Sequence, residues 1–161
     1  MSNEYRDWLA DFLADLTDDQ RKNYELCMKY PILIPINTKD DYIYEYSALD
    51  QMPGGWRIAF GEDWARDVQE VLDKLSRKER DEIFVLDMKE KHGFLDVDIN
   101  YYSEELEAVL DKYKELSRRT CIGCGKPATK ISWGWICPFC DICSTKINAE
   151  MIDINEFFKE D

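Results

Sequence analysis

The chain has 161 residues, 45% of them hydrophobic, and a formal net charge of -13 at pH 7. This apolar content is high enough to bury a core, which excludes an intrinsically disordered chain. The negative charge opposes binding to nucleic-acid phosphates and favours basic protein partners or simple solubility. No run approaches the roughly 18 apolar residues of a membrane span, and the acidic N-terminus lacks the pattern of a secretory signal. The sequence therefore predicts a cytoplasmic protein without a membrane partner.

Two consecutive helices are predicted at the N-terminus. The first has an apolar face at three- and four-residue spacing, formed by Tyr5, Trp8, Leu9, Phe12, Leu13 and Leu16. The second begins at Thr17, whose hydroxyl can cap the helix while Gln20 reaches back in a capping box. It should end before Pro31, because the residue that precedes a proline avoids helical geometry.

Two further helices are predicted in the middle of the chain. A turn at residues 54–56, Gly-Gly-Trp, precedes the first of them, which ends near Ser76 and has the apolar face Trp64, Val68, Val71, Leu72 and Leu75. Ser103 can cap the second, whose predicted buried stripe is Leu106, Val109, Leu110, Tyr113 and Leu116.

An antiparallel hairpin is predicted between these two helices. Residues 83–88 and 94–99 have the composition of strands, and residues 89–93 connect them. In the second strand, Asp96 and Asp98 alternate with apolar residues, so one face of the hairpin should be exposed to solvent. These two carboxylates are candidate interaction residues.

Five of the six cysteines lie in the last third of the chain, at Cys121, Cys124, Cys137, Cys140 and Cys143. A structural zinc ion takes four ligands, usually from two Cys-x-x-Cys pairs. In a reducing cytosol, clustered cysteines bind metal more often than they form disulfides. The sequence therefore predicts one structural Zn²⁺ ion, with one of the five cysteines left over. The sixth, Cys27, falls in a helical pattern and is expected to be an ordinary buried thiol.

The second ligand pair has two alternatives. Cys137 with Cys140 would give two similar knuckles, as in a zinc ribbon. Cys140 with Cys143 would run into residues 144–151, which can form a helix, and a helix start favours ionised thiolates. Residues 128–136 are expected to form two short strands that turn near Gly134, and a hairpin before a helix is the treble-clef arrangement.

The predicted fold class is α+β, with helices packed on a small antiparallel hairpin and a C-terminal treble-clef or zinc-ribbon-like module. The expected parts are an acidic α+β domain over residues 1–120, a zinc-binding module over 121–151 packed on it, and a C-terminal tail over 152–161. The tail carries Phe157 and Phe158 among acidic residues. These two aromatic residues either dock on a partner or pack back on the core.

A nucleic-acid-binding or transcription-related zinc module is the alternative function. Its support is a pair of aromatic residues, Trp133 and Trp135, near a basic cluster formed by Lys112, Lys114, Arg118, Arg119, Lys126 and Lys130. Aromatic side chains beside positive charge can stack single-stranded bases. The overall negative charge makes nucleic acid the less favoured partner.

The sequence does not favour an enzyme. His92 is the only histidine and lies in the predicted hairpin turn. A cage of four cysteines has no open coordination position for a substrate. The patterns of zinc deaminases, phosphate-binding loops and nucleophile elbows are absent from the sequence.

Several short blocks stand together between residues 30 and 143: Tyr-Pro at 30–31, Gly-Trp at 55–56, Lys-Glu-Lys-His-Gly-Phe-Leu at 89–95, Ser-Arg-Arg-Thr-Cys-Ile-Gly-Cys-Gly-Lys-Pro at 117–127, and Gly-Trp at 134–135 before Cys-Asp-Ile-Cys at 140–143. With these blocks the chain resembles a family of small uncharacterised zinc-binding proteins of phages and prophages. The resemblance implies that Cys140 and Cys143 are the second ligand pair and that Cys137 is the extra thiol.

The resemblance also implies a phage-type origin. The expected function is then protein-protein interaction in the host cytoplasm, with an unidentified host protein that has a basic surface as the partner. The expected effect is inhibition or modulation of a host nucleic-acid-handling or defence system.

Overall fold

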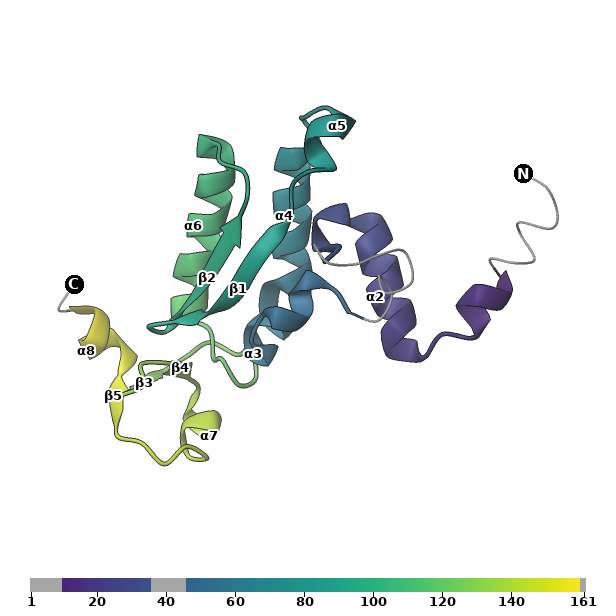
Figure 1. The fold of residues 1–161 in the computed structure, drawn as a ribbon. Coiled ribbons are helices and arrows are strands. Elements are labelled where there is room, and N and C mark those ends of the chain that lie inside the picture. Colours follow the sequence, from purple (N-terminus) through teal and green to yellow (C-terminus); the bar gives the residue numbers. More distant parts are fainter. Residues whose placement is uncertain (1–9, 36–45, 160–161) are drawn as a thin grey trace.

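Long helices and a β-hairpin form the body of the protein, and a small cysteine-rich module lies at one end of this body (Figure 1). This computed structural model describes residues 10–35 and 46–159 of the chain. The mixture of helices with small antiparallel sheets confirms the predicted α+β class. Among the described residues, no helix is both long enough and apolar enough to cross a bilayer.

The second predicted helix has the expected bounds. It is α2, Asp18–Lys29, and Thr17 caps it in a reciprocal capping box with Gln20. The helix ends before Pro31, which begins a short 3₁₀ turn, Pro31–Leu33. The buried Cys27 lies in α2, as predicted. Of the first predicted helix, residues 10–14 are helical, whereas three of its face residues lie outside the described residues: Tyr5, Trp8 and Leu9.

The turn predicted at residues 54–56 is wrong, because these residues are the first turn of a helix. They form α3, Gly54–Trp56, which continues through a π-helical turn, Arg57–Gly61, into α4, Glu62–Leu72. Gly55 serves a close backbone contact instead of a turn: a Cβ atom on it would lie only 2.4 Å from the carbonyl oxygen of Cys121. As predicted, α4 buries Trp64, Val68, Val71 and Leu72.

The predicted hairpin is present, with a shorter connection than expected. After the one-turn helix α5, Arg77–Arg80, strand β1, Val85–Lys91, pairs antiparallel with β2, Phe94–Ile99. Only two residues join the strands, because both have the positive φ that a tight hairpin turn requires: 51° at His92 and 86° at Gly93.

Helix α6, Glu104–Arg118, follows the hairpin and is capped by Ser103, as predicted. One residue of its predicted stripe is placed wrongly, since Leu116 is 44% exposed. The buried residue at this end of the helix is Ser117. Its hydroxyl accepts a hydrogen bond from the Leu95 amide and donates one to the Lys114 carbonyl, so this polar group is buried without losing its partners.

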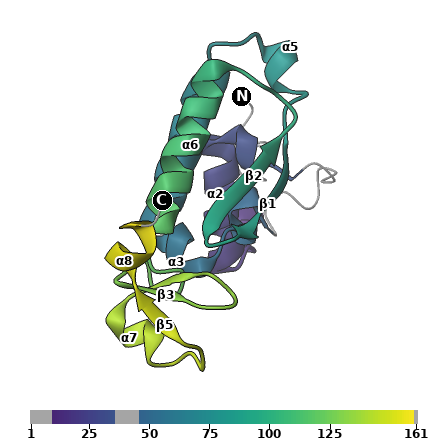
Figure 2. The same cartoon turned by 90° about the vertical axis from the view of Figure 1, so that its left-hand side faces the viewer.

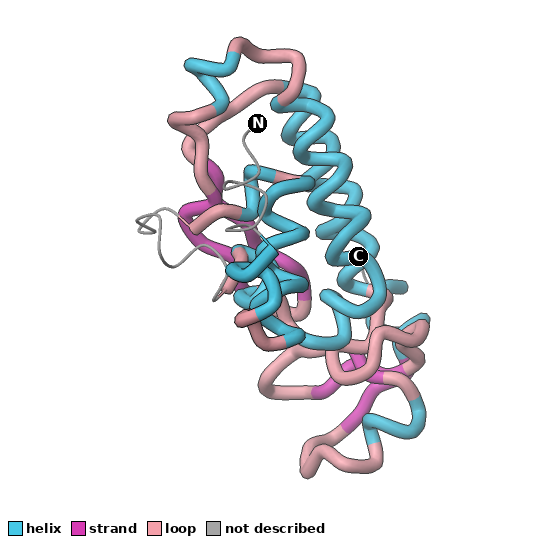
Figure 3. The backbone as a smooth tube through the Cα atoms, turned by 90° about the vertical axis from the view of Figure 1, so that its right-hand side faces the viewer, coloured by secondary structure: helices cyan, strands magenta, loops and turns pink. Residues whose placement is uncertain are grey.

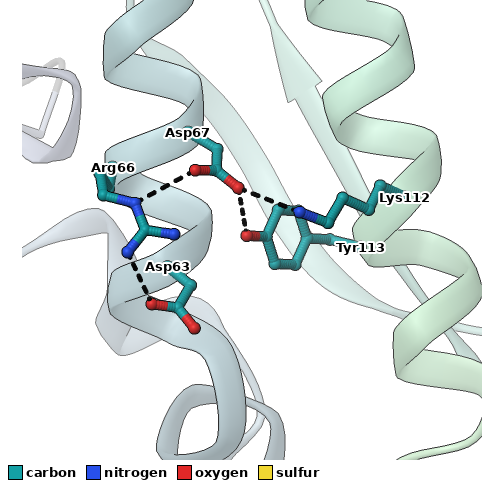
Figure 4. A network of polar contacts seen from close by, with 5 residues as sticks. All are labelled: Asp63, Arg66, Asp67, Lys112 and Tyr113. Carbon is teal, nitrogen blue, oxygen red and sulfur yellow. Dashed lines mark hydrogen bonds and ion pairs between the residues drawn. The ribbon is translucent and has the colours of Figure 1, made fainter.

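The main core lies where α4 and α6 pack against the inner face of the hairpin (Figure 2). Viewed from the other side, the strands follow one side of the helices and the module extends beyond them (Figure 3). A polar network also joins the two helices on their outer side (Figure 4). In it, Asp67 of α4 accepts hydrogen bonds from its neighbour Arg66 and from Tyr113 and Lys112 of α6.

The cysteine-rich module contains a three-stranded antiparallel sheet. Strand β3, Lys130–Ser132, lies between β4, Pro138–Phe139, and β5, Met151–Asp153. The turn after β3 contains Gly134, as predicted. The second strand begins later than expected, at residue 138, and β5 was not predicted.

One prediction for the end of the chain needs correction. The helix predicted over residues 144–151 is wrong, because α7, Asp141–Ser144, is a single turn. The Ser144 and Thr145 hydroxyls bond back to the carbonyls of Asp141 and Ile142, a local pairing that competes with helix continuation. Within the segment predicted as a C-terminal tail, residues 152 and 153 complete β5, and α8, Ile154–Lys159, follows with Ile154 buried.

Candidate metal centre

Four cysteines come together in the module: Cys121, Cys124, Cys140 and Cys143. Their sulfur atoms all lie within 4.8 Å of one another. The sulfurs of Cys124 and Cys140 are 3.6 Å apart, much farther than the roughly 2.05 Å of a disulfide bond. Zinc–sulfur bonds of about 2.3 Å in a tetrahedron place sulfurs roughly 3.8 Å apart. The spacing of the four donor atoms is therefore compatible with a metal ion of the size of zinc.

The first pair lies in a tight backbone knuckle. The Cys121 amide donates to the Lys126 carbonyl at 2.7 Å, and the Gly125 amide donates to the Cys121 carbonyl at 3.0 Å. Gly125 closes the knuckle with a φ of 86°, which L side chains rarely adopt. Gly123 lies against the sulfurs, since a Cβ there would be 3.3 Å from the Cys143 sulfur. The Cys-x-x-Cys spacing and its glycines thus direct both thiols to one side.

The second pair brackets the start of α7. Cys140 is the N-cap residue, and its sulfur accepts a hydrogen bond from the Cys143 amide at 3.3 Å. This bond is the largest of several effects that together bring the pKa of Cys140 to about 7: burial opposes it, and hydrogen bonds with the other three cysteine thiols of the cluster add to it. The pKa of Cys143 is raised to about 12, chiefly because its thiol hydrogen-bonds to Cys140. Cys140 therefore ionises more readily than Cys143, and the thiolate is the form that binds a metal.

Cys137 lies outside the four-cysteine cluster. Its side chain is fully buried, and burial together with the nearby Glu90 raises the pKa of its thiol. The thiol donates to a Glu90 carboxylate oxygen at 3.5 Å, so it faces the hairpin of the body. The pairing of Cys137 with Cys140 as ligands is therefore not the arrangement of this structure.

Glu90 is a residue of this region that sequence reasoning missed. It comes from β1, and its carboxylate accepts hydrogen bonds from the Gly93 amide at 2.9 Å and the Trp135 indole at 3.3 Å, as well as from Cys137. A single carboxylate thus connects the hairpin turn to the module. A glutamate in the predicted hairpin connection gives no sign of this role in the sequence, because its partners in the module, Trp135 and Cys137, are distant along the chain.

A second connection joins the first cysteine pair to α3. The Gly55 amide donates to the Ile122 carbonyl, and the Trp56 indole donates to the Thr120 carbonyl, both at 2.9 Å. A Cβ on Gly125 would lie 2.6 Å from the Gly55 carbonyl oxygen, so the backbones touch directly. The cysteine cluster is therefore located where the module meets the body.

The remaining predicted interaction residues do not gather at the cluster. Trp133 and Trp135 flank the turn after β3, and each is 57% exposed. Phe157 and Phe158 are half-buried in α8, and the guanidinium groups of Arg118 and Arg119 lie over the Phe158 ring at 5.1 and 4.4 Å. The two β2 carboxylates lie apart from the cluster on the hairpin: Asp96, half-buried, and Asp98, exposed.

Comparisons of the chain with protein-family models, with curated proteins and with solved structures each found no match. What the site can do is therefore argued from its geometry.

Proposed function

We propose that the four cysteines hold one structural zinc ion and that the protein acts by binding another protein with a basic surface. The observation that carries the proposal is the donor set itself. Four protein sulfurs lie within 4.8 Å of one another at the junction of module and body, and four thiolate ligands on one zinc ion leave no position open for a substrate. Thiolate sulfur in a tetrahedral arrangement favours zinc over magnesium or calcium, which prefer oxygen ligands.

The zinc ion would act as a cross-link. A structural zinc supplies on the order of 10 kcal/mol of folding free energy in a small module. Here that energy would hold the knuckle in the shape that Gly55 and Trp56 contact, so the metal would orient the module on the body. The β3–β4 pair that precedes α7 and the position of Cys140 at the start of α7 support a treble-clef-like description.

The charge of the chain defines the class of partner. A protein with a formal charge of -13 associates most readily with a basic surface, and the rate of encounter rises at low salt. The resemblance to phage and prophage proteins makes a host protein the expected partner, with inhibition or modulation of nucleic-acid handling or defence as the effect.

Single-stranded nucleic acid is the second candidate, and the exposure of Trp133 and Trp135 favours it. Against it, several of the nearby cations already have partners within the protein. Lys112 pairs with Asp67, Lys114 lies over the Phe94 ring, and Arg119 lies over Phe158. The ion pair with Asp67 offsets the charge of Lys112, and the ring contacts hold the Lys114 and Arg119 side chains against the protein.

Affinity capture from cells tests the proposal. The zinc-loaded full chain, with a tag, is expected to retain one or more specific basic proteins at moderate salt and to release them as salt increases. In parallel, fluorescence anisotropy with a labelled single-stranded oligonucleotide is expected to give no saturable binding. Recovery of no specific protein, or saturable oligonucleotide binding at moderate salt, would contradict the proposal.

A further inference from the structure

The outer edge of β2 faces away from β1, its partner strand in the hairpin. The Leu95 amide in β2 donates to the Ser117 hydroxyl of α6 at 2.8 Å, so it points away from β1. Backbone groups alternate in direction along a strand, and those of Val97 and Ile99 therefore face the same outer edge. In the described part of the chain, β1 is the only strand that pairs with β2. Ser117 closes this edge at Leu95, and the edge is open from Val97 onward.

A groove follows the open edge. It lies between β2 and α6 and has a volume of about 330 Å³. Its apolar lining includes Val97 and Ile99 from the strand, Leu110 from the helix and Tyr101 from the connection between them, all of them half-buried. The groove thus offers main-chain groups of β2, which can hydrogen-bond to an added strand, together with apolar surface.

The charges around the groove are strongly asymmetric. Asp96 and Asp98 line it from β2, and Glu107 and Asp111 line it from α6. The one basic lining residue, Lys114, lies over the Phe94 ring at 4.3 Å. Four carboxylates against one lysine favour a basic occupant and oppose nucleic acid.

Asp98 is also placed at a cost to folding. It lies directly opposite Asp87 in the hairpin register, and like charges at opposed positions destabilise a strand pair. Lys89, which ion-pairs with Asp87 at 3.2 Å and lies opposite Asp96, offsets part of this repulsion.

We propose that this groove binds an extended basic segment of the partner protein, which adds as a strand to the outer edge of β2 from Val97 onward. In such a strand, alternate side chains point to opposite faces. Apolar residues would contact Leu110 and Tyr101, and the intervening Lys or Arg residues would lie beside Asp96 and Asp98. Main-chain bonds supply affinity in this mode, and the alternating side chains supply specificity. The inference rests on the proposed function and names the surface through which it operates.

A peptide titration tests the groove. The probe is a short capped peptide in which Lys and Val alternate, added to the ¹⁵N-labelled, zinc-loaded full chain and followed by NMR. Saturable shifts are expected at the amides of Val97 and Ile99 and along the facing side of α6. A peptide of the same sequence with N-methylated backbone at alternate residues is the control for strand pairing and should lose most of the binding.

A pair of charge variants separates the groove from general acidity. Asp96→Asn with Asp98→Asn should weaken peptide binding about fivefold to tenfold at low salt. The matched control is Glu25→Gln with Glu70→Gln, which removes the same charge from two exposed helix positions outside the groove and should change binding less than twofold. Shifts centred elsewhere, equal binding of the N-methylated peptide, or equal effects of the two double variants would overturn the inference.

The groove and the proposed function can fail separately. If capture yields a basic partner whose binding is unaffected by the Asp96 and Asp98 substitutions, the groove inference is wrong and the function stands. If the peptide binds at β2 as expected but capture yields no partner, the function is wrong and the groove remains a basic-peptide site.

Discussion

At the residue scale, Asp67 provides polar contacts that connect α4 to α6. Its side chain is only 18% exposed, and it accepts hydrogen bonds from Tyr113, Arg66 and Lys112 (Figure 4). Burial acts to raise the pKa of Asp67, but these bonds outweigh burial and hold the pKa below its usual value. The ionised carboxylate is therefore the form that the fold stabilises.

Replacing Asp67 with Asn should destabilise the protein by about 2 kcal/mol at neutral pH, since it removes charged hydrogen bonds from a mostly buried site. Because the folded-state pKa lies below the unfolded value of about 3.9, this contribution is present above roughly pH 4 and is lost as the pH falls through the folded value. Urea unfolding of wild type and variant at several pH values measures the difference. The control is Asp63→Asn, which removes an exposed ion pair with Arg66 and should cost less than about 1 kcal/mol. Equal losses in the two variants would contradict this account.

Residue by residue, the candidate site was predictable where its signal is local. The spacing of the cysteines and the glycines between them identify the cluster, because a Cys-x-x-Cys pair is brought together by its own short turn. Glu90 was not predictable, since its partners Trp135 and Cys137 lie 45 and 47 positions away and only the fold brings them together. The same holds for the contact of Gly55 with Ile122.

At the element scale, α3 is the contact between the body and the first cysteine pair. Gly55→Ala should destabilise the protein by at least about 3 kcal/mol, because the new Cβ would lie within 2.6 Å of backbone atoms of Cys121 and Ile122. Gly54→Ala is the matched control, since a Cβ on Gly54 meets nothing within 4 Å and alanine has the higher helix propensity. Thermal unfolding of both variants measures the contrast. Comparable stability of the two would show that α3 does not pack on the knuckle as described.

The β-hairpin provides a second prediction at this scale. Asp98→Asn removes a like-charge pair with Asp87, so it should stabilise the protein by a few tenths of a kcal/mol at low salt. The same substitution should weaken binding of the Lys-Val peptide. Chemical unfolding and the NMR titration together measure these opposite effects. A loss of stability would mean that the Asp98 carboxylate has a structural role.

Elements with local signals were predicted well, and those decided by tertiary contacts were not. The caps at Thr17 and Ser103 and the alternation in β2 are local patterns, and each element formed as expected. Gly55 of α3 was misinterpreted because a tight turn and a close backbone contact both favour glycine. The strand β5 could not be foreseen, since it pairs with β3 across about twenty intervening residues.

At the scale of the whole molecule, the cysteine cluster, α3 and Glu90 together fix the module on the body. Glu90 connects the module to the hairpin, and Gly55 and Trp56 connect the cysteine knuckle to α3. In the proposed function, a metal ion at this junction would hold these contacts in place, and partner binding would take place on the acidic surface of the body. The central claim is therefore that Cys121, Cys124, Cys140 and Cys143 form one closed metal site.

Metal analysis of the purified full chain and of two variants tests this claim most directly. One zinc ion per chain is expected in the wild type, as for other four-thiolate sites. Cys137→Ser should retain it, because the Cys137 thiol faces Glu90 and not the cluster. Cys143→Ser should lose most of the zinc and unfold the module, because a ligand is removed. Zinc lost with Cys137→Ser and retained with Cys143→Ser, or a wild type that binds no metal, would contradict the account.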